Sequence, residues 1–390
     1  MQTQHHKHRL LFSLPRDFAR RRRIIRRISN VAFIAVLSVA VAYVITRPVG
    51  GTGFKLPKGA DRSASSGAAT PSAAYPEGSF ADGYHLKDGP FVVTEVSDIV
   101  LHDAKRNKDL HVRIFYPNSV GPYPVIVFSH GAGGSQTCCD SLTRHWATYG
   151  YVTLQPTHED SAVRRRNAGE ENILFLQAVR EALKNPALWE SRPRDISFVL
   201  DSLPALENRI PGLAGKMDAT RIGVGGHSMG SYTAEAIAGA TVDLPGHPGM
   251  SFADRRVKAI LCLSPQGPGQ FGLTGHSFDG IKLPFIGMTG SLDSLGPVAS
   301  PVWHKAAFER SQPGDKFQVF INGANHMSFI NARTLSPAPS AKAEAIIGYT
   351  NSASLAFWDV YLKGDAQAKE YLQSEALQDS SHRAVTLSRR

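Results

Sequence analysis

The apolar positions along the chain predict short buried strands that alternate with helices. Residues 91–100 and 110–116 alternate apolar and polar side chains, as in an antiparallel pair with one solvated face. Continuous apolar runs predict further strands at residues 125–128, 151–154, 222–224, 257–263, 285–288 and 317–321, the last taken as the final strand. Helices are predicted between them at residues 139–149, 172–183, 196–206, 231–240 and 301–310. This alternation indicates an α/β fold with a mostly parallel central sheet and helices on both faces.

The positive charge is concentrated at the N-terminus. The formal net charge is +10, but residues 1–30 carry nine Lys and Arg against one Asp, which is +8 and leaves +2 for the other 360 residues. A body this close to neutral argues against a nucleic-acid-binding surface. Residues 28–46 are uncharged and mostly apolar, and as a helix they would be about 28 Å long, close to the thickness of a bilayer core.

This pattern predicts four segments. They are a basic cytoplasmic tail (1–27), a transmembrane anchor or signal segment (28–46), a flexible linker rich in Gly, Ala, Ser, Pro and Thr (47–79), and one folded α/β domain (80–390). The domain would then lie on the outer side of the inner or plasma membrane. Alternatively, cleavage after the Ala-Val-Ala sequence that ends at Ala42 would release it as a secreted protein.

A G-x-S-x-G sequence centred on Ser228 stands between a predicted strand and a predicted helix. Strand, tight turn and helix in this order are typical of a nucleophile elbow, which exposes the serine hydroxyl above the sheet. The turn is so tight that Gly226 and Gly230 are needed beside the serine. The same geometry directs the Met229 amide, at a helix N-terminus, toward an oxyanion.

A second oxyanion donor is expected from the glycine-rich loop that follows the strand at residues 125–128. The loop reads His-Gly-Ala-Gly-Gly, and the Ala132 amide is the predicted donor. His130 precedes Ser228 in the chain, whereas elbow enzymes have the order serine, acid, histidine. We therefore expect His130 to fix the loop rather than to act as the base.

The base and its acid are expected after Ser228, each at the carboxyl end of a strand. His326 follows the strand at residues 317–321, so an imidazole there can turn toward the serine. No other downstream histidine follows a strand so directly; these are His247, His276, His304 and His382. Asp293, after the strand at residues 285–288, is the predicted acid, with Asp279 as the second candidate.

Taken together, these motifs resemble the α/β-hydrolase superfamily. Within it the chain is similar to the group of platelet-activating-factor acetylhydrolases, dienelactone-hydrolase-like proteins and bacterial polyester-degrading cutinases, over about residues 110–326. The segments that carry the closer resemblance are residues 123–131 and 157–162. The resemblance implies hydrolysis of carboxylic esters with short or moderate acyl groups through an acyl-serine. It also implies Ser228 as nucleophile, His326 as base and Asp293 as its partner. Ser228 stands where dienelactone hydrolases have cysteine, which argues against that substrate.

The remaining motifs add little chemistry. The Gly- and Pro-rich residues 265–280 are expected to border the pocket, with Gln266, Phe271, Leu273 and Phe278 along an acyl groove, although a plain surface excursion explains the segment nearly as well. No phosphate loop, dinucleotide fingerprint or zinc-ligand spacing is present, so we expect catalysis without metal or cofactor. The three cysteines allow at most one disulfide.

Three functions remain open. The sequence favours a membrane-tethered or exported serine esterase that acts on a small-molecule or lipid ester. A peptidase or acyltransferase would use the same residues. A non-catalytic binding protein on the same scaffold is disfavoured because all three catalytic positions are filled.

Overall fold

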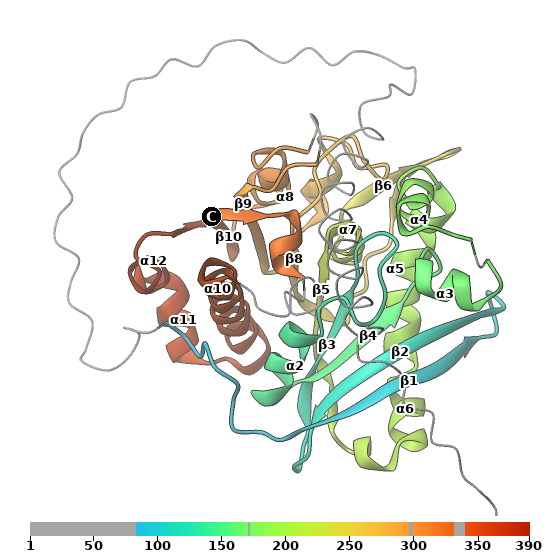
Figure 1. Ribbon diagram of the computed structural model, residues 1–390, viewed down its shortest axis with the longest axis horizontal. Coiled ribbons are helices and arrows are strands. Elements are labelled where there is room, and N and C mark those ends of the chain that lie inside the picture. Colours follow the sequence, from blue (N-terminus) through green and yellow to red (C-terminus); the bar gives the residue numbers. More distant parts are fainter. Residues whose placement is uncertain (1–82, 171, 296–298, 331–339) are drawn as a thin grey trace, which may run out of the picture.

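A nine-stranded sheet forms the centre of the computed structural model, which describes residues 83–170, 172–295, 299–330 and 340–390 (Figure 1). In spatial order the strands are β1 (Val93–Asp103), β2 (Lys108–Pro117), β4 (Val152–Thr157), β3 (Tyr123–Ser129), β5 (Met217–His227), β8 (Val257–Leu263), β9 (Phe285–Leu292), β10 (Lys316–Asn325) and β11 (Val385–Arg389). Two further strands, β6 (Thr241–Leu244) and β7 (His247–Ser251), pair in a separate hairpin.

The middle of the sheet is parallel and its edges are antiparallel. The six strands from β4 to β10 pair in parallel, whereas β1–β2, β2–β4 and β10–β11 pair antiparallel. This confirms the predicted mixed sheet and its opening antiparallel pair. The prediction that residues 317–321 form the final strand is wrong, because β11 adds beside β10 as an edge strand.

Helices cover both faces of the sheet. They are α2 (Asp140–Thr148), α3 (Ala162–Asn167), α4 (Phe175–Ala182), α5 (Pro186–Asp201), α6 (Leu203–Arg209), α7 (Met229–Ile237), α8 (Ala306–Arg310), α10 (Ala341–Trp358), α11 (Ala366–Gln373) and α12 (Ala376–Ser380). Short 3₁₀ turns are η1 (Pro211–Leu213), η2 (Ser277–Gly280), η3 (Trp303–Lys305) and η4 (His326–Phe329), and a π-turn, η5 (Asp359–Lys363), follows α10.

Consecutive residues of the central strands point into two separate cores. In β3, Val125 and Val127 pack in the core that contains α5, α6 and α7, whereas Ile126 and Phe128 pack in the core that contains α2, α10 and α11. This alternation is the period of two of a strand buried on both faces. Figure 1 shows α10 and α11 on one side of the sheet and α5 on the other. The sheet is therefore a rigid, fully covered platform.

Two predicted helices differ from those observed. The prediction at residues 196–206 is divided, because α5 begins at Pro186, contains Pro193 and ends at Asp201, and α6 then starts at Leu203. Pro204 lacks the amide proton that a continuous helix needs, so a break here is expected physically. The prediction at residues 301–310 is likewise divided into η3 and α8.

Some of the predicted segments lie outside the described residues. The basic tail, the apolar run at 28–46 and the linker at 47–79 are all among them. Within the described part of the chain, no helix combines the length and the apolar character that crossing a membrane requires.

Candidate functional site

The turn between β5 and α7 has the strained backbone of a nucleophile elbow. Ser228 separates the end of β5 from the start of α7 and has φ of 57° and ψ of −119°. A positive φ is uncommon for a residue with a side chain and persists where the surrounding structure imposes it. Here the Ser228 amide donates to the Leu263 carbonyl of β8 at 2.9 Å, which anchors the turn to the sheet.

Gly226 and Gly230 leave no room for a side chain. A Cβ at Gly226 would lie 2.1 Å from the Gly230 carbonyl oxygen, and a Cβ at Gly230 would lie 1.9 Å from the Ser129 carbonyl oxygen. Both obstacles are backbone atoms, which cannot move aside without displacing β3 or α7. The elbow therefore packs directly against the carboxyl end of β3, where the glycine-rich loop of residues 130–134 begins.

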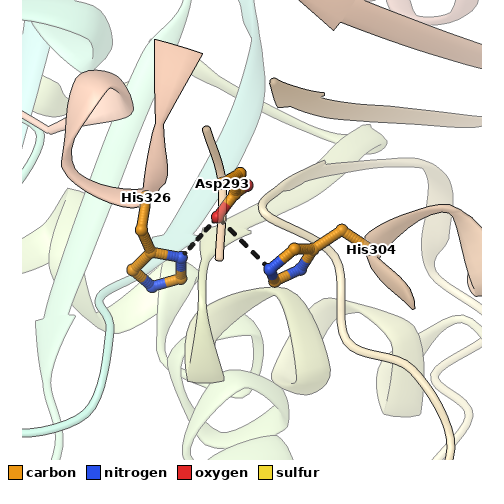
Figure 2. Close-up of side chains that lie close together, drawn as sticks. All are labelled: Asp293, His304 and His326. Carbon is orange, nitrogen blue, oxygen red and sulfur yellow. Dashed lines mark hydrogen bonds and ion pairs between the residues drawn. The ribbon is translucent and has the colours of Figure 1, made fainter. Parts of the chain in front are cut away.

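His326 and Asp293 form a hydrogen-bonded pair at the carboxyl ends of β10 and β9 (Figure 2). The His326 Nδ1 lies 2.9 Å from Asp293 Oδ1, and both residues are buried. Because a carboxylate only accepts, Nδ1 carries the proton, and in the neutral ring Nε2 is left with a free lone pair. The structure thus brings together two residues that are 33 positions apart and that the sequence places after separate strands.

The second oxygen of Asp293 is held by two hydroxyl groups. Ser264 Oγ donates to Oδ2 at 2.7 Å and Thr289 Oγ1 donates to it at 2.8 Å. Burial would raise the pKa of this carboxyl, but the hydrogen bonds and charges of His304 and His326 hold its pKa well below the usual range. Asp293 is therefore a fixed anion behind His326.

His304 is a second histidine on Asp293, and we did not predict it. Its ring is fully buried, and Nε2 faces Asp293 Oδ1 at 3.2 Å from the side opposite His326 (Figure 2). Its position in η3, rather than after a strand, gave no signal in the sequence.

The elbow and the His326 turn are tied by the residue before the serine. His227 Nε2 donates to the carbonyl oxygen of His326 at 2.8 Å, and the two rings lie 4.9 Å apart between centroids. Burial, with the proximity of His326, lowers the pKa of His227 to about 3, so the ring is neutral and keeps this single donor role. The fold thereby holds Ser228 and His326 on neighbouring turns at the same edge of the sheet.

The loop after β3 lies beside the serine. A Cβ at Gly131 would be 3.5 Å from Ser228 Cβ, so the two backbones are close neighbours. The Gly131 carbonyl is engaged on its other side by His130 Nδ1 at 2.6 Å, the Gly134 amide at 3.0 Å and Arg192 Nη2 at 3.2 Å. In a trans peptide the N–H points opposite the carbonyl, so the Ala132 amide is directed away from these donors. As expected, His130 acts on the loop, and its Nε2 accepts the His158 amide.

Arg192, from α5, clamps this loop from beneath. Only 1% of it is exposed, and its guanidinium donates to the His130 carbonyl at 2.6 Å and to the Gly131 carbonyl. The same guanidinium pairs with Asp160 at 2.8 Å, and Asp160 also accepts the Gly133 amide at 2.8 Å. Although burial raises the pKa of Asp160, Arg192 holds that pKa well below its usual range, so the pair stays charged. Two consecutive carbonyls and one amide of the loop are thus fixed by one buried ion pair.

The predicted groove residues are not exposed. Gln266 is 3% exposed, Phe271 is 2% exposed, and Leu273 and Phe278 are also buried. Phe271 packs against Trp189 and Tyr232 within the core rather than facing a substrate. The prediction that Gln266 and Phe271 contact substrate is corrected accordingly: the segment folds inward because its large apolar side chains fill the space beside α7. Asp279, the second candidate acid, lies 3.4 Å from Nδ1 of the exposed His276 instead.

A different set of apolar side chains surrounds the candidate site. Half-buried side chains from four segments gather on Val179 of α4: Ala132, Phe175, Leu176, Leu183, Leu295 and Met327. Ala132 belongs to the glycine-rich loop after β3, Leu295 follows Asp293 by two residues, and Met327 follows His326. No pattern in the sequence indicates this cluster, because its members are scattered over nearly 200 positions.

One group of side chains has the composition of a metal site. Among the described residues, Asp293, His304 and His326 place ligand atoms within 4.8 Å of one another. His326 Nδ1 is hydrogen-bonded to Asp293 Oδ1 at 2.9 Å, and His304 Nε2 faces the same oxygen at 3.2 Å with a geometry that falls short of a hydrogen bond. We assign no metal to this cluster.

A mostly parallel sheet with a tight turn at Ser228 after β5, Asp293 after β9 and His326 after β10 is the arrangement typical of the α/β-hydrolase fold. A family profile described as chlorophyllase matches residues 85–251. A curated relative, Cutinase est1 of Thermobifida alba, is 26% identical over 217 residues, which are 55% of this chain and 57% of the cutinase. The chain thus spans little more than half the length of that relative. Fold and both matches agree on the α/β-hydrolase superfamily, with similarity to its cutinase-like group.

The close packing of the elbow predicts that alanine has opposite effects on stability at two helical glycines, Gly230 and Gly348. We expect Gly230→Ala to prevent folding of the elbow, because its Cβ would collide with the backbone of β3. Gly348→Ala, at a half-buried position of α10 where an added Cβ would have its nearest neighbour at 3.5 Å, is the matched control and should stabilise the protein by up to about 1 kcal/mol. Urea denaturation of both variants measures this. Equal stability of the two would contradict the close approach at Gly230.

Proposed function

We propose that this chain is a serine ester hydrolase with Ser228 as nucleophile, His326 as general base and Asp293 as the residue that orients it. The proposal is carried by one observation: the buried His326–Asp293 pair at the edge of the sheet where the strained turn holds Ser228. Similarity to a chlorophyllase profile and to a cutinase supports ester substrates.

In the proposed first step, the Ser228 hydroxyl attacks the ester carbonyl carbon while His326 Nε2 takes the hydroxyl proton. The carbonyl oxygen becomes an oxyanion that the Ala132 and Met229 amides stabilise. When the tetrahedral intermediate collapses, the bond to the alcohol breaks, and His326 returns the proton to the leaving oxygen. The products of this step are the free alcohol and an acyl-Ser228.

Water completes the cycle by the same route. His326 takes a proton from a water molecule as its oxygen attacks the acyl carbon. Collapse of the second intermediate releases the carboxylic acid and returns the proton to Ser228. Asp293 stays ionised throughout and stabilises the imidazolium that forms in each step.

The substrate is proposed to present an apolar acyl or alcohol group. The half-buried side chains around Val179 offer an apolar wall next to Ala132 and Met327, which flank the proposed oxyanion and base positions. Short to moderate acyl esters fit this short wall, whereas charged groups would lose hydration without gaining a partner there.

The location of the enzyme is a separate proposal that comes from the sequence alone. The arginine-rich start and the uncharged residues 28–46 support a single-pass anchor, with the domain on the outer side of the membrane. Alkaline carbonate extraction that leaves the chain in the membrane pellet supports anchoring. A mature N-terminus near Ala42 would instead indicate secretion.

Replacement of the nucleophile tests the proposed function. We expect Ser228→Ala to lower turnover of short p-nitrophenyl esters by at least about 10³-fold and to abolish labelling by a fluorophosphonate probe. Ser294→Ala, which removes an exposed hydroxyl next to Asp293, is the control and should label normally. Unchanged labelling of Ser228→Ala would reject the assignment. Failure of the wild type to label would favour a binding protein.

The contacts of Arg192 with the loop after β3 predict that weakening them lowers kcat and leaves KM nearly unchanged. Arg192→Lys keeps a positive charge beside Asp160 but cannot bind both loop carbonyls, so the Ala132 amide loses its fixed direction. We expect kcat to fall by about 10²-fold with KM nearly unchanged, because the oxyanion forms only in the transition state. Arg194→Lys on the same helix is the control, because among the described residues the Arg194 guanidinium pairs with Glu190 and not with the loop. Wild-type kcat in a folded Arg192→Lys protein would contradict the role of the clamp.

A further inference from the structure

His304 is enclosed by oxygen atoms on both sides of its ring. Nδ1 lies 2.7 Å from the Pro265 carbonyl oxygen, and Nε2 lies 3.2 Å from Asp293 Oδ1, a contact whose geometry falls short of a full hydrogen bond. The ring is fully buried. A carbonyl oxygen and an ionised carboxylate can only accept protons.

This arrangement decides the protonation state of the ring. A neutral imidazole carries one proton, so one of its nitrogens would turn a lone pair toward an oxygen at close range. Nδ1–H donates a hydrogen bond to the Pro265 carbonyl oxygen. In a neutral ring the lone pair on Nε2 would then face the negative charge of Asp293. A second proton on Nε2 removes this repulsion and replaces it with an ion pair.

We propose that His304 is held as an imidazolium, and that it shares Oδ1 of Asp293 with His326 as a positioning residue that sets the pH range of the site. This inference rests on the proposed function for its kinetic consequence but not for the charge itself. His304 touches no reacting atom, because Asp293 lies between it and His326.

The groups that surround His304 come from four elements. Asp293 after β9 is the carboxylate in contact with it, and His326 of η4 lies 5.9 Å away between ring centroids. His227 at the end of β5 is held neutral, as described above. From α7, Glu235 accepts the Gln266 amide next to Pro265, and burial raises the pKa of Glu235 to about 8, so it is largely uncharged at neutral pH. Asp293 is thus the anion that balances His304.

The expected effect on catalysis follows from the sign of the charge. A cation on the far side of Asp293 opposes a second positive charge on His326, so His326 stays neutral, and able to accept a proton, to lower pH. Without the positive charge on His304, the Asp293 carboxylate interacts with His326 alone. The protonated form of His326 is then favoured, and the acid limb of the pH–rate profile moves to higher pH.

The kinetic test compares two histidine substitutions. His304→Gln keeps a neutral donor for Asp293 but removes the charge. We expect the acid limb of kcat/KM for a p-nitrophenyl ester to move up by about one pH unit, with the plateau within a few-fold of wild type. His276→Gln, which changes a histidine whose side chain is 95% exposed, should leave the profile unchanged. An unmoved acid limb in a folded His304→Gln protein would overturn the proposal.

A direct measurement removes the dependence on activity and on the folding of the variant. In the wild-type chain labelled with ¹⁵N-histidine, the ring nitrogens of His304 should both show the shifts of protonated imidazolium nitrogens at pH 7, with and without a chelator. A neutral ring overturns the proposal, and so does a ring that changes when the chelator is added, since a metal would then occupy Nε2. If the chain hydrolyses no ester but His304 is cationic, the proposed function fails and the charge assignment stands.

Discussion

The buried carboxylate of Asp293 is the interaction on which the candidate site depends. The hydroxyls of Ser264, which follows β8, and of Thr289 in β9 satisfy one oxygen, and histidines from η4 and η3 approach the other, so side chains from several elements meet at one carboxylate. An isolated charge at such a depth would be costly, and only this set of donors makes it stable. The carboxylate therefore organises the edge of the sheet as well as orienting His326.

A second buried charge organises the other half of the site. Arg192 and Asp160 together fix the backbone of the loop after β3. Glycines in this loop allow its backbone to approach Ser228 closely, but a glycine-rich backbone has no single preferred conformation. The ion pair fixes the conformation of the loop, so the Ala132 amide is held in one orientation although the surrounding sequence is rich in glycine. Buried charges that a substrate does not reach thus support both halves of the site. They are Asp293 in one half and the Arg192–Asp160 ion pair in the other.

The sequence predicts those parts of the site that local patterns encode. The elbow around Ser228 is a motif of consecutive residues, and His326 follows a strand that the apolar pattern identifies. The sequence does not predict His304 or Arg192, because a histidine in a short turn and an arginine on a helix are ordinary surface residues until the tertiary structure buries them. Phe271 shows the opposite error: a Gly-rich segment suggests an exposed loop, yet the fold turns its large side chains into the core. The edge strand β11 is too short and polar to be identified from its pattern.

In the proposed site, the Ser228 hydroxyl, the His326–Asp293 pair and two backbone amides converge on a single reacting carbon. A crystal structure of the chain after reaction with a fluorophosphonate tests it most directly. We expect phosphorus bonded to Ser228 Oγ, the phosphoryl oxygen within about 3 Å of the Ala132 and Met229 nitrogens, and His326 Nε2 facing Oγ. An adduct on another residue, or a phosphoryl oxygen out of reach of both amides, would contradict it.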